Sequence, residues 1–539
     1  MLSKIQTPLQ AALLIFEGWF DRPLGPDWNP LRHLGALSFF FFWVVVVSGI
    51  YVYIFFETSV GSAYNSIERM TIDHWYISGV MRSFHRYASD AMVVVVLLHM
   101  FREFIMDRYR GIRWFTWVSG IPTIWLLYAS GIGGYWLVWD EFAQYLIIAS
   151  SEWLDWLGIF GEPLANNFLT REAFTDRMFS LLLFLHIAIP LFLLIASWIH
   201  VIKISRPRIN PPKGMAIGTI SMMTVLSLIK PAISDAPADL SIVPQDLNLD
   251  WFYALLYPLY DKWGAGALWI ITVGVSSFLT ILPWLPPQKI NDSAQVDNLN
   301  CNGCSRCYTD CPFGAVTMQP RTDGRPYPRI AEVDPDICTA CGICIGACPT
   351  ATPFRSQDML VTGIDLPRFR LTELRDNTDK SLAQLKEKIP GDKPRIIVYG
   401  CDFGIDVKQI DAPNVVVTKL PCIGMLPPSF VDYILMRDKA DGVMLTGCRE
   451  GDCFHRFGIQ WTEQRMAGER DPYLRKRVPV ERVHTCWGAV TDSKKLHEEI
   501  AEFEASLIAQ QPLEIVLPEK PRKPVADRPA ENPTREAAE

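Results

Sequence analysis

The sequence predicts a multi-domain chain. An all-α transmembrane bundle of about six helices is followed by an α+β domain and then a small α/β domain. The chain has 539 residues, of which 49% are hydrophobic and 20% charged, and it contains 18 Trp. Soluble globular proteins of this size carry more charge, so part of the chain is expected in a membrane. All 13 cysteines fall between Cys301 and Cys486, which predicts different chemistry in the two halves of the chain.

Segments of membrane length define the bundle. A helix needs about 20 apolar residues to cross a hydrocarbon core of about 30 Å. Uncharged runs of that order lie at 34–56, 114–139, 178–202 and 263–287. Residues 80–104 have an apolar centre but also carry charged residues and histidines, which is typical of a spanning helix with functional polar groups. Residues 215–228 form a shorter apolar segment, which is long enough to span only when 230–234 are added. With it, six spanning helices are expected.

Charged residues predict the orientation, because positively charged loops favour the cytoplasmic side. The loops after the second and fourth spans are basic, with Arg102, Arg108, Arg110 and Arg113 in one and Lys203, Arg206, Arg208 and Lys213 in the other. The opposite loops are acidic, with Asp140, Glu141, Glu152, Asp155 and Glu162 in one and Asp235, Asp239, Asp246 and Asp250 in the other. No cleavable signal peptide is apparent. We therefore expect a multi-pass protein of the cytoplasmic (inner) membrane, with both termini and the cysteine-rich part in the cytoplasm.

Four of the nine histidines lie inside predicted spans, in two pairs with equal spacing. His85 and His99 are 14 residues apart, and so are His186 and His200. This spacing places both members of a pair on nearly one face of a helix, about 21 Å apart along its axis. Two such helices running in the same direction can hold two stacked hemes b, with His85 opposite His186 near the outer side. The other two histidines then meet near the cytoplasmic side, and bis-imidazole ligation favours electron transfer over oxygen chemistry.

A single intramembrane His is as readily an ordinary satisfied polar residue, but glycines on the neighbouring spans repeat the 14-residue spacing. They are Gly35 and Gly49 on the first span and Gly120 and Gly134 on the third. Glycine lets a porphyrin approach the backbone, although a glycine pair also occurs where helices pack closely. Arg82 and Arg102 each lie three residues from a predicted ligand. They can pair with heme propionates or serve as interfacial basic residues.

Residues 1–290 resemble cytochrome b of the bc-type quinol oxidoreductases. The resemblance rests on M-R-S-F-H-R (81–86), L-L-H-M-F-R (97–102), G-Y-W-L-V-W-D (134–140), F-L-H (184–186) and W-I-H (198–200). It implies a four-helix heme domain over 1–212 and a two-helix segment with a quinone-site loop over 213–290. A dimer is implied in the same way.

The resemblance also implies quinone sites. The outer site of the family includes a Pro-Glu-Trp-Tyr element, and the stretch Leu249-Asp250-Trp251-Phe252 keeps the acid and the Trp but lacks the Pro and Tyr. Asp250 is therefore the candidate catalytic residue, as proton donor or acceptor, with an ordinary acidic loop residue as the alternative. His33, two residues before Gly35, is a candidate for a quinone on the cytoplasmic side. A plain interfacial His at a helix start is the other interpretation.

The strongest motif in the chain is a repeated cysteine run. C-N-G-C-S-R-C-Y-T-D-C-P (301–312) and C-T-A-C-G-I-C-I-G-A-C-P (338–349) both have the spacing C-x2-C-x2-C-x3-C-P. This spacing is typical of two-cluster ferredoxins, in which the fourth Cys of each run serves the other cluster. The expected ligand sets are Cys301, Cys304, Cys307 and Cys348 for one [4Fe–4S] cluster and Cys338, Cys341, Cys344 and Cys311 for the other. A zinc ribbon needs only paired Cys-x-x-Cys, so we predict a ferredoxin-like α+β domain over 291–356.

Apolar segments at 395–400, 414–420, 430–437 and 442–447 predict strands alternating with amphipathic helices, in a small α/β domain over 390–512. The tail at 513–539 is rich in Pro and charge and is expected to be disordered. Five cysteines remain in this domain: Cys401, Cys422, Cys448, Cys453 and Cys486.

The motifs Y-G-C-D-F-G, L-P-C-I-G, T-G-C-R-E-G-D-C-F-H and H-T-C-W resemble the delta subunit of methyl-viologen-reducing hydrogenases, which implies a [2Fe–2S] cluster. The first motif has one Cys where the family commonly has two. The favoured ligands are Cys401, Cys422, Cys448 and Cys453, with Cys486 in reserve. Buried free cysteines and a zinc site are the alternatives.

Together these features predict a subunit of a quinone-linked oxidoreductase. Electrons would pass between a cytoplasmic donor or acceptor and the membrane quinone pool, through the [2Fe–2S] domain, the two [4Fe–4S] clusters and the two hemes, in that order. The chain has no G-x-G-x-x-G fingerprint after a strand, so a cytoplasmic flavoprotein or heterodisulfide-reductase-like partner is expected. A net charge of -7 excludes a nucleic-acid-binding class. The alternatives are a non-catalytic electron wire and membrane anchor, or a subunit of an electron-bifurcating or confurcating quinone enzyme.

Overall fold

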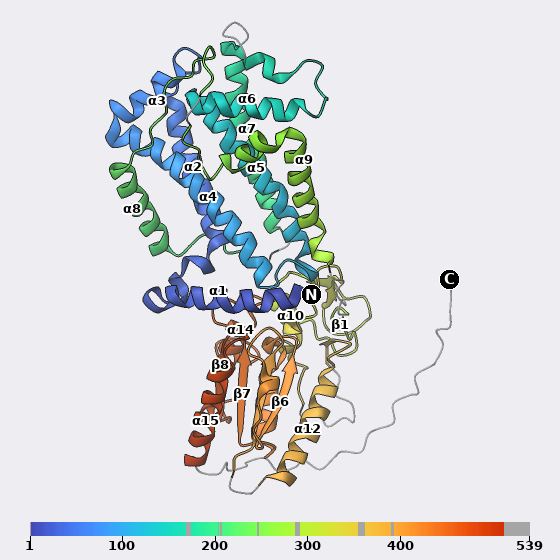
Figure 1. Cartoon of the computed structure of the whole chain (residues 1–539). Coiled ribbons are helices and arrows are strands. Elements are labelled where there is room, and N and C mark those ends of the chain that lie inside the picture. Colours follow the sequence, from blue (N-terminus) through green and yellow to red (C-terminus); the bar gives the residue numbers. More distant parts are fainter. Residues whose placement is uncertain are drawn as a thin grey trace.

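The computed structural model describes residues 2–168, 174–202, 204, 207–244, 247–285, 292–353, 362–389 and 393–510. A helical bundle occupies one end of the molecule and a parallel sheet the other (Figure 1). Helix α1 (Leu2–Leu24) lies across the base of the bundle, between the two. The predicted tail at 513–539 lies outside the described residues, and so do the charged residues Lys203, Arg206 and Asp246.

Each of the six predicted spans contains a helix, but the extension of the fifth by 230–234 is wrong, because the chain leaves the helix at Lys230. Four segments are long and apolar enough to cross a membrane, namely α2 (Leu34–Phe55), α5 (Trp114–Val138), α7 (Asp176–Val201) and Ala254–Trp284, which contains α9 (Tyr257–Ile281). α4 (Val80–Ile105) has 26 residues but carries charged side chains, and α8 (Lys213–Ile229) has 17. Helix α9 breaks at Gly264, whose φ of 80° is left-handed, so its straight apolar part begins close to the predicted start of the sixth span.

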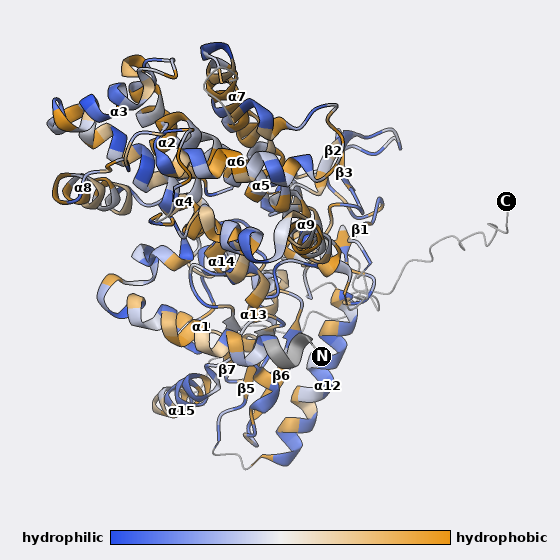
Figure 2. Ribbon diagram, turned by 45° about the horizontal axis from the view of Figure 1, so that its top comes forward, coloured by the Kyte–Doolittle hydropathy of each residue, from blue (hydrophilic) through white to orange (hydrophobic). Residues whose placement is uncertain are grey.

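The bundle is built from two packed helix pairs. α2 packs along α4, and α5 packs along α7. Many apolar side chains remain exposed on the outside, including Phe184, Leu191 and Phe192 of α7, which are 60–65% exposed. Figure 2 shows hydrophobic residues along α7, whereas hydrophilic and hydrophobic residues alternate on α12 (Leu371–Lys388) near the sheet. An apolar exterior of this kind suits a lipid environment.

Shorter helices close the end of the bundle far from the sheet (Figure 1). They are α3 (Ala63–Ile72) and α6 (Glu141–Asp155). α6 begins at Asp140, whose carboxylate accepts a hydrogen bond from the Ala143 N–H at 2.8 Å, an N-terminal cap.

The first cysteine-rich module is small. Strand β1 (Gln295–Val296) pairs antiparallel with β4 (Ile364–Asp365), and β2 (Val316–Pro320) pairs antiparallel with β3 (Arg329–Val333). Two single-turn helices, α10 (Arg306–Asp310) and α11 (Ile343–Gly346), carry part of each cysteine run. The predicted α+β character is confirmed.

The C-terminal module is a four-stranded parallel sheet of order β6-β5-β7-β8. Its strands are β5 (Ile396–Cys401), β6 (Val415–Leu420), β7 (Gly442–Gly447) and β8 (Val483–Trp487). Its helices are α13 (Pro428–Leu435), α14 (Gly458–Met466) and α15 (Ser493–Ala509). The central strands β5 and β7 are buried at every residue, as expected for a parallel sheet covered on both faces. The carboxyl ends of the strands point toward the bundle (Figure 1).

Candidate heme and iron-sulfur sites

The predicted histidine pairs meet inside the bundle. The ring centres of His85 and His186 are 6.1 Å apart, with the rings at 78° to one another. A metal–imidazole bond is about 2.0–2.1 Å long, so two rings on opposite sides of one metal ion have centres about 6 Å apart. His99 and His200 line one cavity of about 770 Å³ at the end of the bundle nearest the sheet. The donors fit two bis-histidine hemes, as the sequence predicts.

Each of the four predicted glycines lies against one of the four histidines. A Cβ built on the glycine would lie 2.8–3.4 Å from the Cε1 atom of the facing ring. The facing pairs are Gly49 with His85, Gly134 with His186, Gly120 with His200 and Gly35 with His99. The glycines therefore make room for the imidazole itself.

Backbone carbonyls orient two of these rings. The Nδ1 atom of His85 is 2.9 Å from the Val45 carbonyl oxygen, and that of His186 is 3.0 Å from the Ser130 carbonyl oxygen. Both carbonyls belong to the residue four positions before the facing glycine, Gly49 or Gly134. Because a carbonyl only accepts, Nδ1 donates, which leaves Nε2 of each ring as the metal-binding nitrogen.

The two arginines predicted to face propionates have protein partners. Arg82 donates to the Glu68 carboxylate at 2.9 Å and to Ser234 Oγ at 2.6 Å. Arg102 donates to Glu17 at 2.8 Å and to Asp452 at 2.9 Å. Their pairing with propionates stays a prediction.

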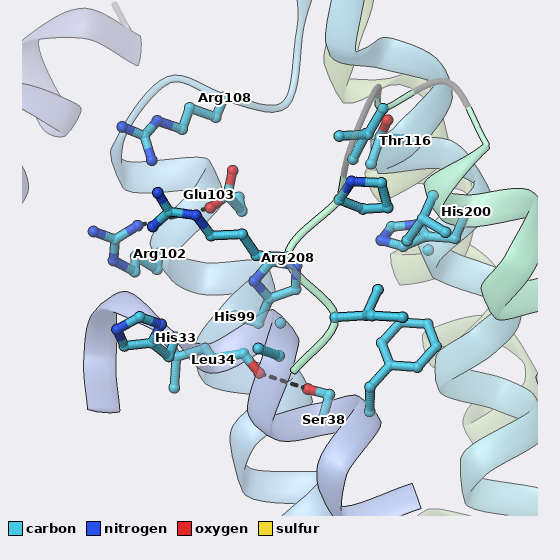
Figure 3. A pocket seen from close by; sticks show the side chains of 18 of the residues that line it. His33, Leu34, Ser38, His99, Arg102, Glu103, Arg108, Thr116, His200 and Arg208 are labelled. Atoms are coloured by element: carbon cyan, nitrogen blue, oxygen red, sulfur yellow. Dashed lines mark hydrogen bonds and ion pairs between the residues drawn. The ribbon is translucent and has the colours of Figure 1, made fainter. Parts of the chain in front are cut away.

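The inner cavity also contains the predicted residue His33. Figure 3 shows His33, His99, His200 and Arg208 around this cavity. His33 Nε2 is 2.9 Å from the Asp27 carbonyl oxygen. Burial lowers the pKa of His33, and the charge of Arg208 acts in the same direction. A neutral imidazole at this position can exchange a proton with a ligand in the cavity.

Asp250 lies in a buried polar cluster. Its carboxylate pairs with Arg86 at 3.2 Å and accepts a hydrogen bond from the Tyr135 hydroxyl. Arg86 also pairs with Asp90 at 3.1 Å and stacks over the Tyr135 ring. A second cavity of about 770 Å³ contains His186 in its wall, but Asp250 is not among its lining residues. The cluster explains the charges that interrupt the second predicted span.

The structure brings the cysteines of each predicted ferredoxin set close together. Cys301, Cys304, Cys307 and Cys348 line one small cavity. Cys341 has Cys311 and Cys338 as its charged neighbours, and burial followed by these neighbours raises the pKa of the Cys341 thiol to about 12. Cys344 lies near Cys341, Cys338 and Cys311 of its own set and also near Cys307 of the other set. Each set offers four sulfur donors for a [4Fe–4S] cluster, and Cys304 is exposed.

Four of the five remaining cysteines gather at the carboxyl edge of the sheet. Cys401 Sγ lies 3.7 Å from Cys448 Sγ, and Cys422 contacts Cys401 and Cys453. Cys448 also contacts Cys453, which closes a ring of four thiols. Three of the four follow or end β5, β6 and β7, because the carboxyl ends of parallel strands meet at one edge. We call this group the four-cysteine site.

Cys486 does not join the four-cysteine site. It lies on β8 in a separate apolar core with α15, next to Lys495 and Glu499. Four sulfur donors, three of them buried and Cys453 partly exposed, suit an iron-sulfur cluster, which is what the resemblance implies.

The cysteine sites and the inner histidines are neighbours. Cys341 of the second ferredoxin set and Cys422 belong to one buried cluster with Ile343 and Trp461. Cys453 lines the same cavity as His99 and His200. The C-terminal site thus lies between the ferredoxin sites and the histidines, so the carrier order expected from the chain is wrong.

Sequence reasoning missed the residues that hold this arrangement. Burial would raise the pKa of Asp452, but the charges of Arg108, Arg102 and Arg449 outweigh it and hold that pKa well below its usual range. Arg449 also pairs with Glu17 of α1. The only sequence signal was the dipeptide Asp-Cys, which occurs at 310–311 and again at 452–453.

Three family models match successive parts of the chain. Residues 21–207 match the family model of cytochrome b/b6/petB, residues 300–352 the 4Fe-4S dicluster domain, and residues 400–509 the methyl-viologen-reducing hydrogenase delta subunit. The cytochrome b of Acanthamoeba castellanii is 24% identical over 301 residues, covering 49% of this chain and 76% of the relative. The cytochrome b6 of Gracilaria tenuistipitata var. liui is 26% identical over 191 residues, covering 35% of this chain and 87% of the relative.

One solved structure, titled "Hyperthermophilic respiratory Complex III", matches with 18% identity and a TM-score of 0.40, covering 47% of this chain and 75% of that chain. The three family matches occur in the order predicted from the sequence. The chain is therefore a membrane electron-transfer subunit that joins a cytochrome b/b6 domain, a 4Fe-4S dicluster domain and a methyl-viologen-reducing hydrogenase delta-subunit domain.

Proposed function

We propose that this subunit passes electrons between a cytoplasmic flavoprotein and the membrane quinone pool, using two [4Fe–4S] clusters, a cluster at the four-cysteine site and two hemes b. The observation that carries the proposal is the unbroken series of donor sets from exposed Cys304 to His186 deep in the bundle. The balance is simple: two electrons and two protons convert one quinone to quinol, and the reverse applies when quinol is the donor.

The second cavity is the proposed quinone site. It lies among α5, α6, α7 and α9 and is lined mainly by apolar and aromatic side chains, including Tyr128, Trp136 and Trp269, with His186 in its wall. Large apolar pockets with few polar groups are typical small-molecule sites. The neighbouring histidine places a bound quinone beside the outer heme site. Asp250 would act from the adjacent Arg86–Tyr135 cluster.

The exposed Cys304 marks the proposed partner side. A [4Fe–4S] cluster held there is the most accessible of the proposed groups, and delta-type domains usually dock onto flavoproteins. Purification of the intact assembly from membranes should therefore bring a flavin-containing subunit with the heme. Co-purification of a Rieske protein or a cytochrome c would instead favour the bifurcating alternative.

The test is anaerobic heme reduction by a quinol analogue, followed at the b-type α-band of the oxidised protein. We expect rapid reduction in the wild type and at least about tenfold slower reduction in Ala129→Phe, which fills the second cavity. Gly274→Phe on α9 is the control, because its Cβ would meet no atom within 4 Å. Asp250→Asn should slow reduction if Asp250 moves a proton. Reduction by dithionite but not by quinol would make the chain a wire and membrane anchor.

A further inference from the structure

We propose that two buried Asp–Arg junctions, Asp452 with Arg102 and Arg108 and Asp310 with Arg465, hold the cysteine sites and the inner histidine pair in one fixed series. The proposal deepens the proposed function, because it names the residues that position the groups. Asp452 and Asp310 are positioning residues: each directly precedes a cysteine of a predicted ligand set, Cys453 or Cys311.

The inner junction ties the four-cysteine site to the bundle. The carboxylate of Asp452 binds Arg102 at 2.9 Å and Arg108 at 2.6 Å, and all three side chains are at most 10% exposed. Arg102 lies three residues after His99 on α4. The ion pair therefore links the residue beside Cys453 to the turn that carries His99.

Further bonds fix the same loop, residues 448–454. Arg32 donates to the Glu450 carbonyl at 2.6 Å, and Arg108 donates to the Asp452 carbonyl at 2.8 Å. Arg113 donates to the Phe454 carbonyl and lies over the Phe454 ring, with 5.1 Å from its guanidinium carbon to the ring centre. Arg32 lies just before α2, and Arg108 and Arg113 lie in the loop after α4. The loop is therefore held to the bundle at three of its residues, Glu450, Asp452 and Phe454.

The outer junction repeats this design between the two cysteine-rich modules. Arg465 of α14 binds the Asp310 carboxylate at 2.6 Å and the Gly424 carbonyl at 3.0 Å. Asp310 precedes Cys311, and Gly424 lies two residues after Cys422. Arg465 thus spans the gap between the second ferredoxin set and the four-cysteine site, and its side chain is 1% exposed.

Charge pairs suit this task better than apolar contacts. A buried ion pair gives little net stability, because desolvation offsets the attraction, but removing one partner leaves a buried charge uncompensated. Such a pair therefore favours the one relative position of the two modules in which both charges are paired, and it destabilises any other position. Clusters and hemes supply one-electron transfer when they are bound. The protein must therefore keep the distances between their binding sites fixed.

The decisive variant is Asp452→Asn in the full-length, cofactor-loaded protein. Asp432→Asn is the matched control, because Asp432 is a buried carboxylate paired with Arg475 and Arg477 within the C-terminal module, away from both junctions. We expect amide hydrogen exchange at residues 449–454 to become at least about tenfold faster in Asp452→Asn only, since exchange reports local opening. Asp452→Glu should restore slow exchange.

Two rates of heme reduction distinguish a positioning role of Asp452 from a general loss of structure. In Asp452→Asn, heme reduction by reduced methyl viologen, supplied to the cysteine sites, should slow at least about tenfold, while quinol-driven heme reduction stays within about twofold of wild type. If hydrogen exchange and viologen-driven heme reduction in Asp452→Asn are both as in the wild type, the proposal is wrong.

If Asp452→Asn loses heme, the same two measurements are made on Arg108→Gln, which leaves Arg102 in place. A wild type that quinol cannot reduce would refute the quinone role alone, because the exchange result does not depend on quinone.

Discussion

At the residue scale, glycine in this bundle accommodates the imidazole. The sequence predicted that the four glycines let a porphyrin approach the backbone, and the structure places a histidine ring against each of them. A glycine also uncovers the carbonyl one helical turn earlier, because no side chain lies over it. That carbonyl then holds Nδ1 of His85 and His186. Spacing predicted which residues lie together, but the contact between each glycine and its histidine depends on the packing of α2 on α4 and of α5 on α7.

Gly49→Ala should remove or displace the outer heme. The new Cβ would lie 2.8 Å from His85 Cε1, so the ring must move from its position opposite His186. We expect the heme content to fall from about two to about one per chain in a pyridine hemochromogen assay. Gly218→Ala on α8, where a Cβ meets nothing within 4 Å, should leave both hemes in place. Full heme content in both variants would refute the role of Gly49.

His200→Ala should remove only the inner heme. His200 shares its cavity with His99, whereas His85 and His186 meet elsewhere in the bundle. The same loss is expected for His99→Ala, and redox titration of the α-band should then show one transition in place of two. Two surviving hemes in each variant would show that the pairing is wrong.

Asp365 is expected to make the free energy of unfolding depend on pH. Burial raises the pKa of Asp365 to about 6, although its carboxylate accepts hydrogen bonds from the Leu366 and Leu371 N–H groups. A raised folded-state pKa stabilises the fold below the unfolded pKa of about 4, and this contribution is lost as pH rises through 6. Asp365→Asn keeps an acceptor oxygen without the charge. We expect it to stabilise the fold by about 2 kcal/mol at pH 7.5.

The measurement for Asp365→Asn is the thermal denaturation midpoint of the full chain in detergent. The advantage of the variant should shrink as the pH falls from 7.5 to 5. Glu373→Gln, an exposed position on the following helix, serves as the control. An advantage that does not change with pH would show that charge is not its cause.

At the element scale, length and hydropathy predicted the long helices, and strand patterns predicted β5, β6 and β7. Residues 430–437 were expected among the strands, but 430–435 lie in α13. Pro428 favours the first turn of a helix, and the apolar run is compatible with the periodicity of a helix as well as of a strand. β8 was missed because V-H-T-C-W has too few apolar residues to stand out. α1 was missed because its helix is amphipathic and contains Pro8.

The strand ends determine which cysteines can act together. Cys422→Ser should abolish the cluster at the four-cysteine site, whereas Cys486→Ser should leave it intact, because Cys486 packs under α15. For a [2Fe–2S] cluster, Cys422→Ser loses about two iron atoms per chain together with the matching electron paramagnetic resonance signal. Zinc in place of iron would support the mononuclear alternative, and a signal lost in Cys486→Ser would contradict the assignment.

At the scale of the whole molecule, chain order and spatial order differ. The delta-type domain is last in the sequence, yet its loop reaches the bundle, where Asp452 meets Arg102 across 350 residues of sequence. No local pattern encodes such a contact: the sequence suggested a heme propionate or the membrane interface for Arg102, and nothing specific for Asp452. Motif spacing and the two family resemblances predicted the ligand sets, but only the docked fold shows which sets are neighbours.

The same arrangement predicts membrane topology. The iron-sulfur modules lie at the end of the bundle that holds His99 and His200, so the loop after α6 must lie on the opposite side of the membrane. In sealed right-side-out vesicles, a membrane-impermeant maleimide should label Gly161→Cys directly. It should label Lys494→Cys, 92% exposed on α15, only after lysis. Labelling of the wild-type protein, in which Cys304 is exposed, is measured in parallel and subtracted. The reverse pattern would place the cysteine sites outside the cell, where a cytoplasmic flavoprotein could not reach them.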